Sequence, residues 1–178
     1  MKKALFLDRD GVLNVDHHYV GRIADFDFVP GVFEALRRAQ AEGYVLIVVT
    51  NQAGIARGYY TEDDFKILTE WMVEAFAKES VTITGVYYCP FHVDGVVPEF
   101  TGESEMRKPN PGMLLQAARD HGLDLGQSMM IGDKESDVDA GKRAGVSKTI
   151  RVDPEETVET SADHVVSSIA ALPQCLGW

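Results

Sequence analysis

The segment Ala4-Leu5-Phe6-Leu7-Asp8-Arg9-Asp10-Gly11 begins with four apolar residues and ends in a charged turn. A short apolar run of this kind predicts a buried β-strand that stops at Asp8. Two carboxylates separated by one residue follow the strand, and Gly11 allows a sharp turn because it lacks a Cβ. Both carboxylates can therefore reach one reacting atom beyond the strand end.

Strands and helices alternate along the rest of the chain. Residues 44–49 are a continuous apolar run, rich in β-branched residues, that ends at Thr50, as is typical of a parallel strand covered on both faces. Strands are expected at 4–7, 44–49, 82–88, 128–131 and 148–152, and helices at 32–40, 61–78, 112–121, 137–144 and from about 169. The alternation predicts an α/β fold with a doubly wound, Rossmann-like parallel sheet. No repeat or linker is present, so residues 1–178 are expected to form a single domain.

Composition limits the possible classes of protein. The chain has 178 residues, 45% of them hydrophobic, which is enough for one sizeable core. Its net charge of −11 argues against nucleic-acid binding, because that affinity depends on clustered Lys and Arg. No segment near the N-terminus resembles a signal peptide, and no apolar run approaches the roughly 20 residues of a membrane span, so we expect a soluble, cytoplasmic protein without a membrane partner. We also expect it to be a monomer. Cys89 and Cys175 are expected to be thiols.

Polar signals lie at the ends of the predicted strands. They are Asp8-Arg9-Asp10-Gly11, Thr50-Asn51, Lys108-Pro109 in the long loop 89–111, and Gly132-Asp133. In a doubly wound sheet, ligands bind beyond the carboxyl ends of the strands. A carboxylate repels a phosphate dianion, so a phosphate site built on these acids needs a divalent cation such as Mg²⁺, which prefers oxygen ligands. Taken singly, the acids at Asp8 and Asp10 and the pair Gly132-Asp133 also fit ordinary turns. Lys108-Pro109 fits the start of a solvated loop, and Asp137 fits a helix cap.

Together and in this order, the four signals resemble the motifs of the haloacid-dehalogenase superfamily over nearly the whole chain. The resemblance implies a phosphatase (phosphoric monoester hydrolase) with the haloacid-dehalogenase fold. A separate cap domain is not expected, since a loop, a helix and a strand fill the interval from Asp8 to Thr50.

The resemblance also implies roles for individual residues. Asp8 would attack the phosphorus and form an aspartyl-phosphate, and Asp10 would act as general acid and base. The groups expected to contact or attract the transferring phosphoryl are Thr50, Asn51, Lys108, Lys134 and Arg107. Asp8, the main-chain carbonyl of Asp10, and Asp133 would hold Mg²⁺.

Longer stretches narrow the resemblance. Val15-Asp16-His17-His18-Tyr19-Val20, Thr50 to Gly58, Tyr88-Cys89-Pro90 and Arg107 to Met113 are similar to the D-glycero-D-manno-heptose 1,7-bisphosphate 7-phosphatases. The implied reaction removes the 7-phosphate of this small phosphorylated sugar, a step toward nucleotide-activated heptose for the lipopolysaccharide core. The implied substrate-binding residues are Asp16, His17, His18, Tyr19, Thr50, Asn51, Gln52, Ala53, Arg107, Lys108 and Lys134.

Several alternatives stay open. The histidinol-phosphate phosphatases share the same outline of motifs. A polynucleotide 3′-phosphatase also fits an open site, although the net charge opposes it. A catalytically silent binding module is disfavoured because every catalytic position is filled. His17 and His18 are also compatible with plain solvent-exposed loop residues.

The long loop departs from the families that it resembles. Both commonly hold a structural zinc through Cys-x-His and, further on, Cys-x-Cys just before Arg-Lys-Pro. Here the first pattern is Cys89-Pro90-Phe91, with His92 one place late, and the second is Ser104-Glu105-Met106. Tetrahedral zinc needs four such ligands, so structural zinc is predicted to be absent and packing of Phe91, Phe100 and Met106 to hold the loop. A degenerate site on Cys89 and His92 is the alternative.

Overall fold

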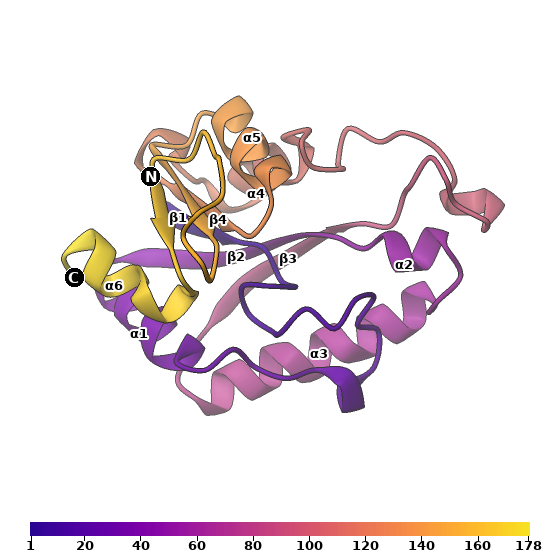
Figure 1. The fold of residues 1–178 in the computed structure, drawn as a ribbon, viewed down its shortest axis with the longest axis horizontal. Helices are drawn as coiled ribbons and strands as arrows, with labels where there is room; N and C mark the ends of the chain where they lie inside the picture. The colour runs from indigo at the N-terminus through magenta and orange to yellow at the C-terminus, as the bar shows by residue number, and fades with distance from the viewer.

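Six parallel strands form one sheet at the centre of the molecule, in a computed structural model that covers residues 1–178. The strands are β1 Lys3–Leu7, β2 Tyr44–Asn51, β3 Ile83–Cys89, β4 Met129–Gly132, β5 Lys148–Val152 and β6 His164–Val166. Their order in space is β3-β2-β1-β4-β5-β6, which places β1 between β2 and β4 (Figure 1). The strand order reverses beside β1, and in open α/β sheets ligands bind in the crevice at such a point.

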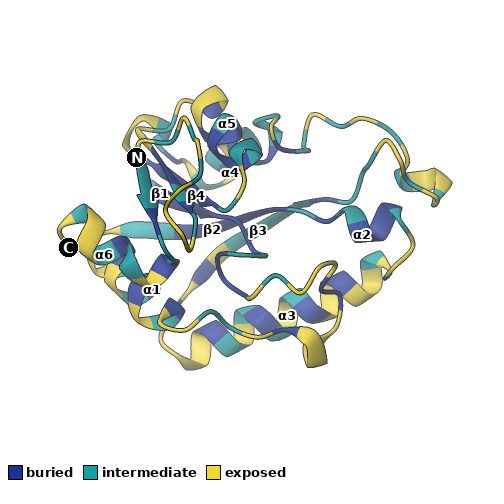
Figure 2. Cartoon of the chain, in the orientation of Figure 1, coloured by how far each residue is buried: buried dark blue, intermediate teal, exposed yellow.

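Helices cover both faces of the sheet, which confirms the doubly wound prediction. α1 Val32–Ala41, α3 Glu62–Lys78 and α6 Leu172–Leu176 lie on one face, and α4 Gly112–His121 and α5 Glu135–Ala144 lie on the other (Figure 1). Each face has its own apolar core: the first lies between the sheet and α1, α3 and α6, and the second lies between the sheet and α4 and α5. Leu5 and Leu7 belong to the first core and Ala4 and Phe6 to the second, because successive strand residues face opposite sides. The central strands are accordingly buried under helices whose outer sides are exposed (Figure 2).

Local signals explain where α3 and α4 begin or end. The Thr61 hydroxyl accepts a hydrogen bond from the main-chain N–H of Asp64, and the Asp64 carboxylate accepts one from the N–H of Thr61. This reciprocal pair is a capping box, and it confirms the predicted start of α3. α4 ends at Gly122, whose φ of +63° is left-handed and stops the helix.

Four of the observed elements differ notably from the predicted ones. β2 continues to Asn51, so the Thr50-Asn51 signal is part of the strand. α5 begins at Glu135 rather than Asp137, because the Asp137 carboxylate accepts a hydrogen bond from the N–H of Lys134 and closes the first turn. β6 and the four-residue α2 Ala53–Ala56 were not predicted, since elements this short show no hydrophobic period.

Two irregular segments lie at the carboxyl ends of the strands. Residues 8–31 connect β1 to α1 and contain only the 3-10 turn Ile23–Asp25. Residues 90–111 connect β3 to α4, contain the 3-10 turn Pro98–Phe100, and extend beyond α2 (Figure 1). No domain is inserted between β1 and β2, as expected for a fold without a separate cap. None of the helices is long and apolar enough to cross a membrane.

Candidate active site

Three neighbouring strands bring their polar residues to one edge of the sheet. Asp8 follows β1, Thr50 and Asn51 end β2, and Asp133 follows β4. A cavity of about 450 Å³ opens at this edge. Eleven of the residues predicted from the sequence line it: Asp8, Asp10, Asp16, His18, Tyr19, Asn51, Gln52, Ala53, Arg107, Lys108 and Lys134. The site therefore combines segments from distant parts of the chain.

Lys108 is a fully enclosed cation beside Asp8. Its side chain is 2% exposed, and its Nζ lies 2.8 Å from Asp8 Oδ1 and 2.6 Å from Asp137 Oδ1. Nζ also donates to the main-chain oxygen of Val49 at 2.7 Å. Burial acts to lower the pKa of Lys108, but Asp137 and Asp8 outweigh it and hold this pKa above its usual value. Lys108 is thus a permanent positive charge next to the predicted nucleophile.

Asp8, Asp133 and Asp137 form an acidic cluster in which one oxygen of each lies within 4.8 Å of the others. Burial raises the pKa of Asp8 and of Asp133, and the charge of Asp137 raises both further. Both Asp137 oxygens are occupied, by Lys108 and by the N–H of Lys134. Asp133 Oδ1 is buried and has no hydrogen-bond partner. A free buried oxygen beside Asp8 fits a divalent cation.

Asn51 connects the end of β2 to the loop that carries Lys108. Its Nδ2 donates to the main-chain oxygen of Lys108, and its Oδ1 accepts from the main-chain N–H of the same residue, both at 3.0 Å. The side-chain amide is thus occupied by the loop backbone, whereas the sequence suggested a contact with the phosphoryl group. Thr50 Oγ1 accepts a hydrogen bond from Gln52 Nε2 at 2.8 Å, which leaves the hydroxyl proton to be donated.

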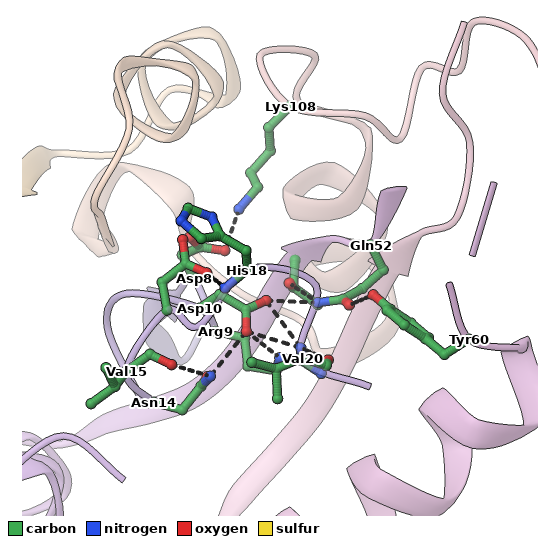
Figure 3. Close-up of polar contacts among 12 residues, drawn as sticks. Asp8, Arg9, Asp10, Asn14, Val15, His18, Val20, Gln52, Tyr60 and Lys108 are labelled. Carbon is green, nitrogen blue, oxygen red and sulfur yellow. Dashed lines mark hydrogen bonds and ion pairs between the residues drawn. The ribbon is translucent and has the colours of Figure 1, made fainter. Parts of the chain in front are cut away.

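The Asp10 carboxylate belongs to a separate hydrogen-bond network (Figure 3). Arg9 Nη2 donates to its two oxygens at 2.9 and 3.0 Å. Asn14 Nδ2 donates to Oδ1 at 2.9 Å, and Gln52 Nε2 donates to Oδ2 at 3.1 Å. Gln52 Oε1 in turn accepts from the Tyr60 hydroxyl. Arg9 lies within the Asp8-Arg9-Asp10-Gly11 signal, but no role was predicted for it, and no motif marks Asn14 or Tyr60.

The rim of the cavity carries two arginines without acidic partners. Arg57 and Arg107 line it, and neither forms a salt bridge. His92 lines it as well, and burial lowers the pKa of its imidazole. Arg107 is half-buried and donates to the main-chain oxygen of Phe91 at 3.3 Å. Burial lowers the pKa of the Arg107 guanidinium, and the charge of Arg57 lowers it further. Two unpaired guanidinium groups at one rim indicate a place for an anion.

The segment 16–19 is only partly directed at the cavity. His18 and Tyr19 line it, each with positive φ, and Tyr19 packs against Tyr59 with ring centres 4.6 Å apart. Asp16 also lines it and accepts a hydrogen bond from the N–H of His18 at 2.9 Å. His17 lies outside the lining, with its Nε2 2.7 Å from Asp27 Oδ2.

The loop 90–111 is held by apolar contacts of the kind predicted for it. Phe91 packs edge-on against Phe100, with ring centres 5.9 Å apart, and Phe91 and Met106 pack against the second core. Cys89 is buried at the end of β3, and His92 Nδ1 accepts a hydrogen bond from the N–H of Asp94 at 3.0 Å. The absence of structural zinc remains a prediction.

Solved structures share this fold. A crystal structure from Mesorhizobium loti, described as that of a HAD-like phosphatase, matches with a TM-score of 0.85 and 39% identity over 96% of this chain and 83% of that one. The D,D-heptose 1,7-bisphosphate phosphatase of B. bronchiseptica, complexed with magnesium and phosphate, gives 0.83 and 26% over 98% and 97%. A family model described as HAD-hydrolase-like matches residues 105–172. The fold and its site thus define a phosphatase of the haloacid-dehalogenase class.

Named relatives narrow the class to one family. The D-glycero-beta-D-manno-heptose-1,7-bisphosphate 7-phosphatase of Pasteurella multocida is 47% identical over 99% of this chain and 97% of its own length. The D-glycero-alpha-D-manno-heptose-1,7-bisphosphate 7-phosphatase of Burkholderia mallei is 52% identical over 92% and 88%. The chain belongs to the D-glycero-D-manno-heptose-1,7-bisphosphate 7-phosphatase family, which confirms the resemblance found in the sequence motifs. Relatives named for the beta and for the alpha anomer both match this chain.

Proposed function

We propose that this protein is a Mg²⁺-dependent phosphatase that removes the 7-phosphate of D-glycero-D-manno-heptose 1,7-bisphosphate on the route to nucleotide-activated heptose. The observation that carries the proposal is the buried ion-pair cluster of Asp8, Lys108 and Asp137 beneath a rim with two unpaired arginines. A substrate with two phosphates suits this arrangement, because one phosphate can react at Asp8 while the other binds at the rim.

The reacting groups are Asp8 and Asp10. A carboxylate oxygen of Asp8 attacks the phosphorus of the 7-phosphate, and the bond from phosphorus to the heptose oxygen breaks. Asp10 gives a proton to the departing alkoxide and later takes one from the water that attacks the aspartyl-phosphate. Lys108 offers its charge to the phosphoryl oxygens, and Thr50 offers a hydroxyl donor. Asn51 and Asp137 hold Lys108 in place from its main chain and its ammonium group.

Asp8, Asp133 and the main-chain carbonyl of Asp10 would hold Mg²⁺. The unpartnered Oδ1 of Asp133 supports this set, as does Gly11, where a Cβ would lie 2.2 Å from Asp133 Oδ2. When bound, Mg²⁺ neutralises the carboxylates that would otherwise repel the phosphate. Activity should disappear in EDTA and return with Mg²⁺, whereas Ca²⁺ should bind and inhibit because it prefers a larger, looser shell. Full activity in excess EDTA would contradict this assignment.

The second phosphate is assigned to Arg107 and Arg57. A guanidinium can grip a phosphate through two N–H groups, and neither arginine has an acidic partner to displace. Lys134, which follows β4, adds a further cation to the lining. The heptose itself is proposed to contact five further lining residues, Asp16, His18, Tyr19, Gln52 and Ala53. His17 supports that segment from outside through Asp27.

The residues of the proposed site come from strand ends and loops at one edge of one sheet. We further propose that residues 1–178 form a single domain, and that the protein acts as a cytoplasmic monomer without structural zinc.

The deciding experiment is a side-by-side measurement of kcat/KM. The substrates are both anomers of the heptose 1,7-bisphosphate, fructose 1,6-bisphosphate and histidinol phosphate, since specificity is the ratio of these constants. We expect a heptose bisphosphate to have the highest value, because it alone presents the seven-carbon sugar with both phosphates. A higher value for histidinol phosphate would assign the protein to the related phosphatases instead.

A further inference from the structure

A buried arginine behind the proposed general acid has no part in the chemistry described above. Arg9 is 1% exposed and does not line the cavity, although it lies between Asp8 and Asp10 in the chain. Burying a guanidinium costs free energy unless it is paired and hydrogen-bonded. The one acidic group that pairs with Arg9 is Asp10. The position of this arginine therefore concerns Asp10 rather than the substrate.

The protein body holds the Arg9 guanidinium from several directions. Its Cζ lies 5.9 Å from the ring centres of both Phe26, in the segment 8–31, and Phe65, in α3. Its Nη2 also donates to the main-chain oxygen of Val20 at 2.6 Å. Because a guanidinium is planar and presents its N–H groups in a rigid fork, anchoring it also orients its carboxylate partner.

A second set of contacts reaches Asp10 from the end of β2 (Figure 3). Gln52 Nε2 donates to Asp10 Oδ2, and the Tyr60 hydroxyl donates to Gln52 Oε1, which turns the amide nitrogen toward Asp10. The Tyr60 ring lies tightly against two glycines: a Cβ on Gly21 would lie 2.4 Å from the ring, and one on Gly54 would lie 2.3 Å from it. Tyr60 is thus confined, and burial raises the pKa of its hydroxyl, so it remains a donor.

The network leaves the Asp10 carboxylate a single orientation. Five N–H···O contacts from Arg9, Asn14 and Gln52 reach its two oxygens. The contacts come from four nitrogen atoms on three residues, so they fix the plane in which the carboxylate lies. The Asp10 side chain is still 22% exposed and lines the cavity, while Arg9 is enclosed behind it.

We propose that Arg9 and the Gln52–Tyr60 pair are positioning residues that aim the Asp10 carboxylate at the leaving oxygen of the substrate. The inference rests on the proposed role of Asp10 as general acid. Proton transfer depends on the alignment of donor and acceptor, and a misaligned acid slows departure of a strongly basic alkoxide. Departure of a weakly basic phenolate needs little help from an acid, so it is nearly insensitive to that alignment.

The test uses the full-length protein in Mg²⁺ with two esters of similar size, benzyl phosphate and 4-nitrophenyl phosphate. Tyr60→Phe removes one hydroxyl and keeps the ring between the two glycines. We expect kcat/KM to fall about tenfold for benzyl phosphate and less than about twofold for 4-nitrophenyl phosphate, because kcat/KM reports the step that expels the leaving group. Arg9→Lys keeps the charge but loses the planar fork of N–H groups, so it should also lower kcat/KM for benzyl phosphate more than for 4-nitrophenyl phosphate.

Two further variants serve as controls. Tyr87→Phe removes a hydroxyl that donates to Asp120 at 2.8 Å on the surface, and it should leave both constants unchanged. Asp10→Asn removes the acid completely, so the ratio of its losses in kcat/KM for the two esters shows the largest leaving-group dependence to be expected.

Three outcomes would overturn the inference. The first is an equal loss for both esters in Tyr60→Phe, and the second is no loss for either ester in a variant that melts like the parent. In both cases a strong leaving-group dependence of Asp10→Asn would keep the proposed role of Asp10. The third is the absence of that dependence in Asp10→Asn, which would remove the role of Asp10 and the inference together. If Arg9→Lys does not fold, Tyr60→Phe alone decides.

Discussion

The floor of the cavity, formed by Asp8, Lys108 and Asp137, differs from its rim, formed by Tyr19, Arg57 and Arg107, in burial and in pairing. On the floor, the three side chains are 2% to 10% exposed and are joined by ion pairs of 2.8 and 2.6 Å. On the rim, Tyr19 is 48% exposed, and the two arginines lack acidic partners. The charged groups of the floor pair with one another, whereas the two arginines of the rim have N–H groups left to bind an anion.

This difference separates two tasks. Charges that are already oriented and desolvated stabilise the transferring phosphoryl without reorganising, so the floor suits any phosphate monoester. Unpaired cations and an aromatic face can bind what else the substrate carries, so the rim suits selection among esters. We therefore expect floor substitutions to act on turnover and folding, and rim substitutions to act on substrate binding.

The largest effect is expected from Asp8→Asn. This change removes the attacking charge and keeps the size of the side chain, so kcat should fall by about three orders of magnitude or more. Retention of more than about a tenth of kcat would contradict a covalent role for Asp8, since one decade is only about 1.4 kcal/mol.

The same variant should also be more stable than the metal-free parent. Burial raises the pKa of Asp8, so the folded parent binds this proton more tightly than the unfolded chain does. The stabilisation that results is lost as the pH rises through the raised pKa. Asparagine does not titrate, so the difference in Tm, measured in EDTA, should widen from acid to neutral pH. A constant difference would show that burial of the charge is not the cause.

Lys108→Met should combine a loss of activity with a loss of stability. It leaves the buried carboxylates of Asp8 and Asp137 without their common partner, which should cost about 3–5 kcal/mol of unfolding free energy in the absence of metal. Adding Asp137→Leu should recover part of the stability and none of the activity, as measured by denaturant unfolding and by kcat. An activity that returned with stability would mean that Lys108 acts only on folding.

Arg107→Met tests the rim. Loss of a charge-assisted contact to the second phosphate should raise KM for the heptose bisphosphate about tenfold to a hundredfold, with kcat nearly unchanged. The matched control is Arg119→Met on α4, where the arginine donates to Gln116 on the surface. Benzyl phosphate has no second phosphate, so its KM should not change. A similar rise in KM for both substrates would place Arg107 at the reacting phosphate.

The smallest effect is expected from the loop behind Arg107. The purified protein should carry well under one zinc per chain, and chelation followed by Mg²⁺ should leave Tm unchanged. Phe91→Ala removes the contact with Phe100 and should cost about 1–2 kcal/mol, less than at a fully buried phenylalanine. It should raise KM through Arg107 more than it lowers kcat. Stoichiometric zinc, or a fall in Tm that only zinc reverses, would make Cys89 and His92 ligands.

Most of the fold could be predicted because its signals are local. The apolar runs before Asp8 and Thr50 identified the central strands, and the capping residue Thr61 identified the start of α3. Asp8, Thr50 and Asp133 lie at one edge of the sheet, as expected for the ends of neighbouring parallel strands, although only Asp8 of the three lines the cavity. The three-residue β6 was missed because so short a segment has no period to detect.

Roles that depend on contacts between distant segments could not be predicted in the same way. Asp137 caps α5 as the sequence suggested, but it also pairs with Lys108, a contact that exists only when the loop 90–111 returns to the sheet. The Asn51 amide was expected at the phosphoryl group, and it binds the main chain of Lys108 instead. Both residues have the chemistry that the sequence indicated, but their partners could be identified only from the structure.

The sequence by itself determined which groups are available: the strand-end acids, the loop cations and the alternation that stacks helices on both faces of a sheet. Only the tertiary structure decided which of these groups are paired and which are free. Arg9 and Arg107 show the reason, because both are arginines next to a motif residue, yet one is enclosed against Asp10 and the other lines the cavity. A charge is neutralised or left available by what lies within a few ångströms of it, and that surrounding is assembled from segments far apart in the chain.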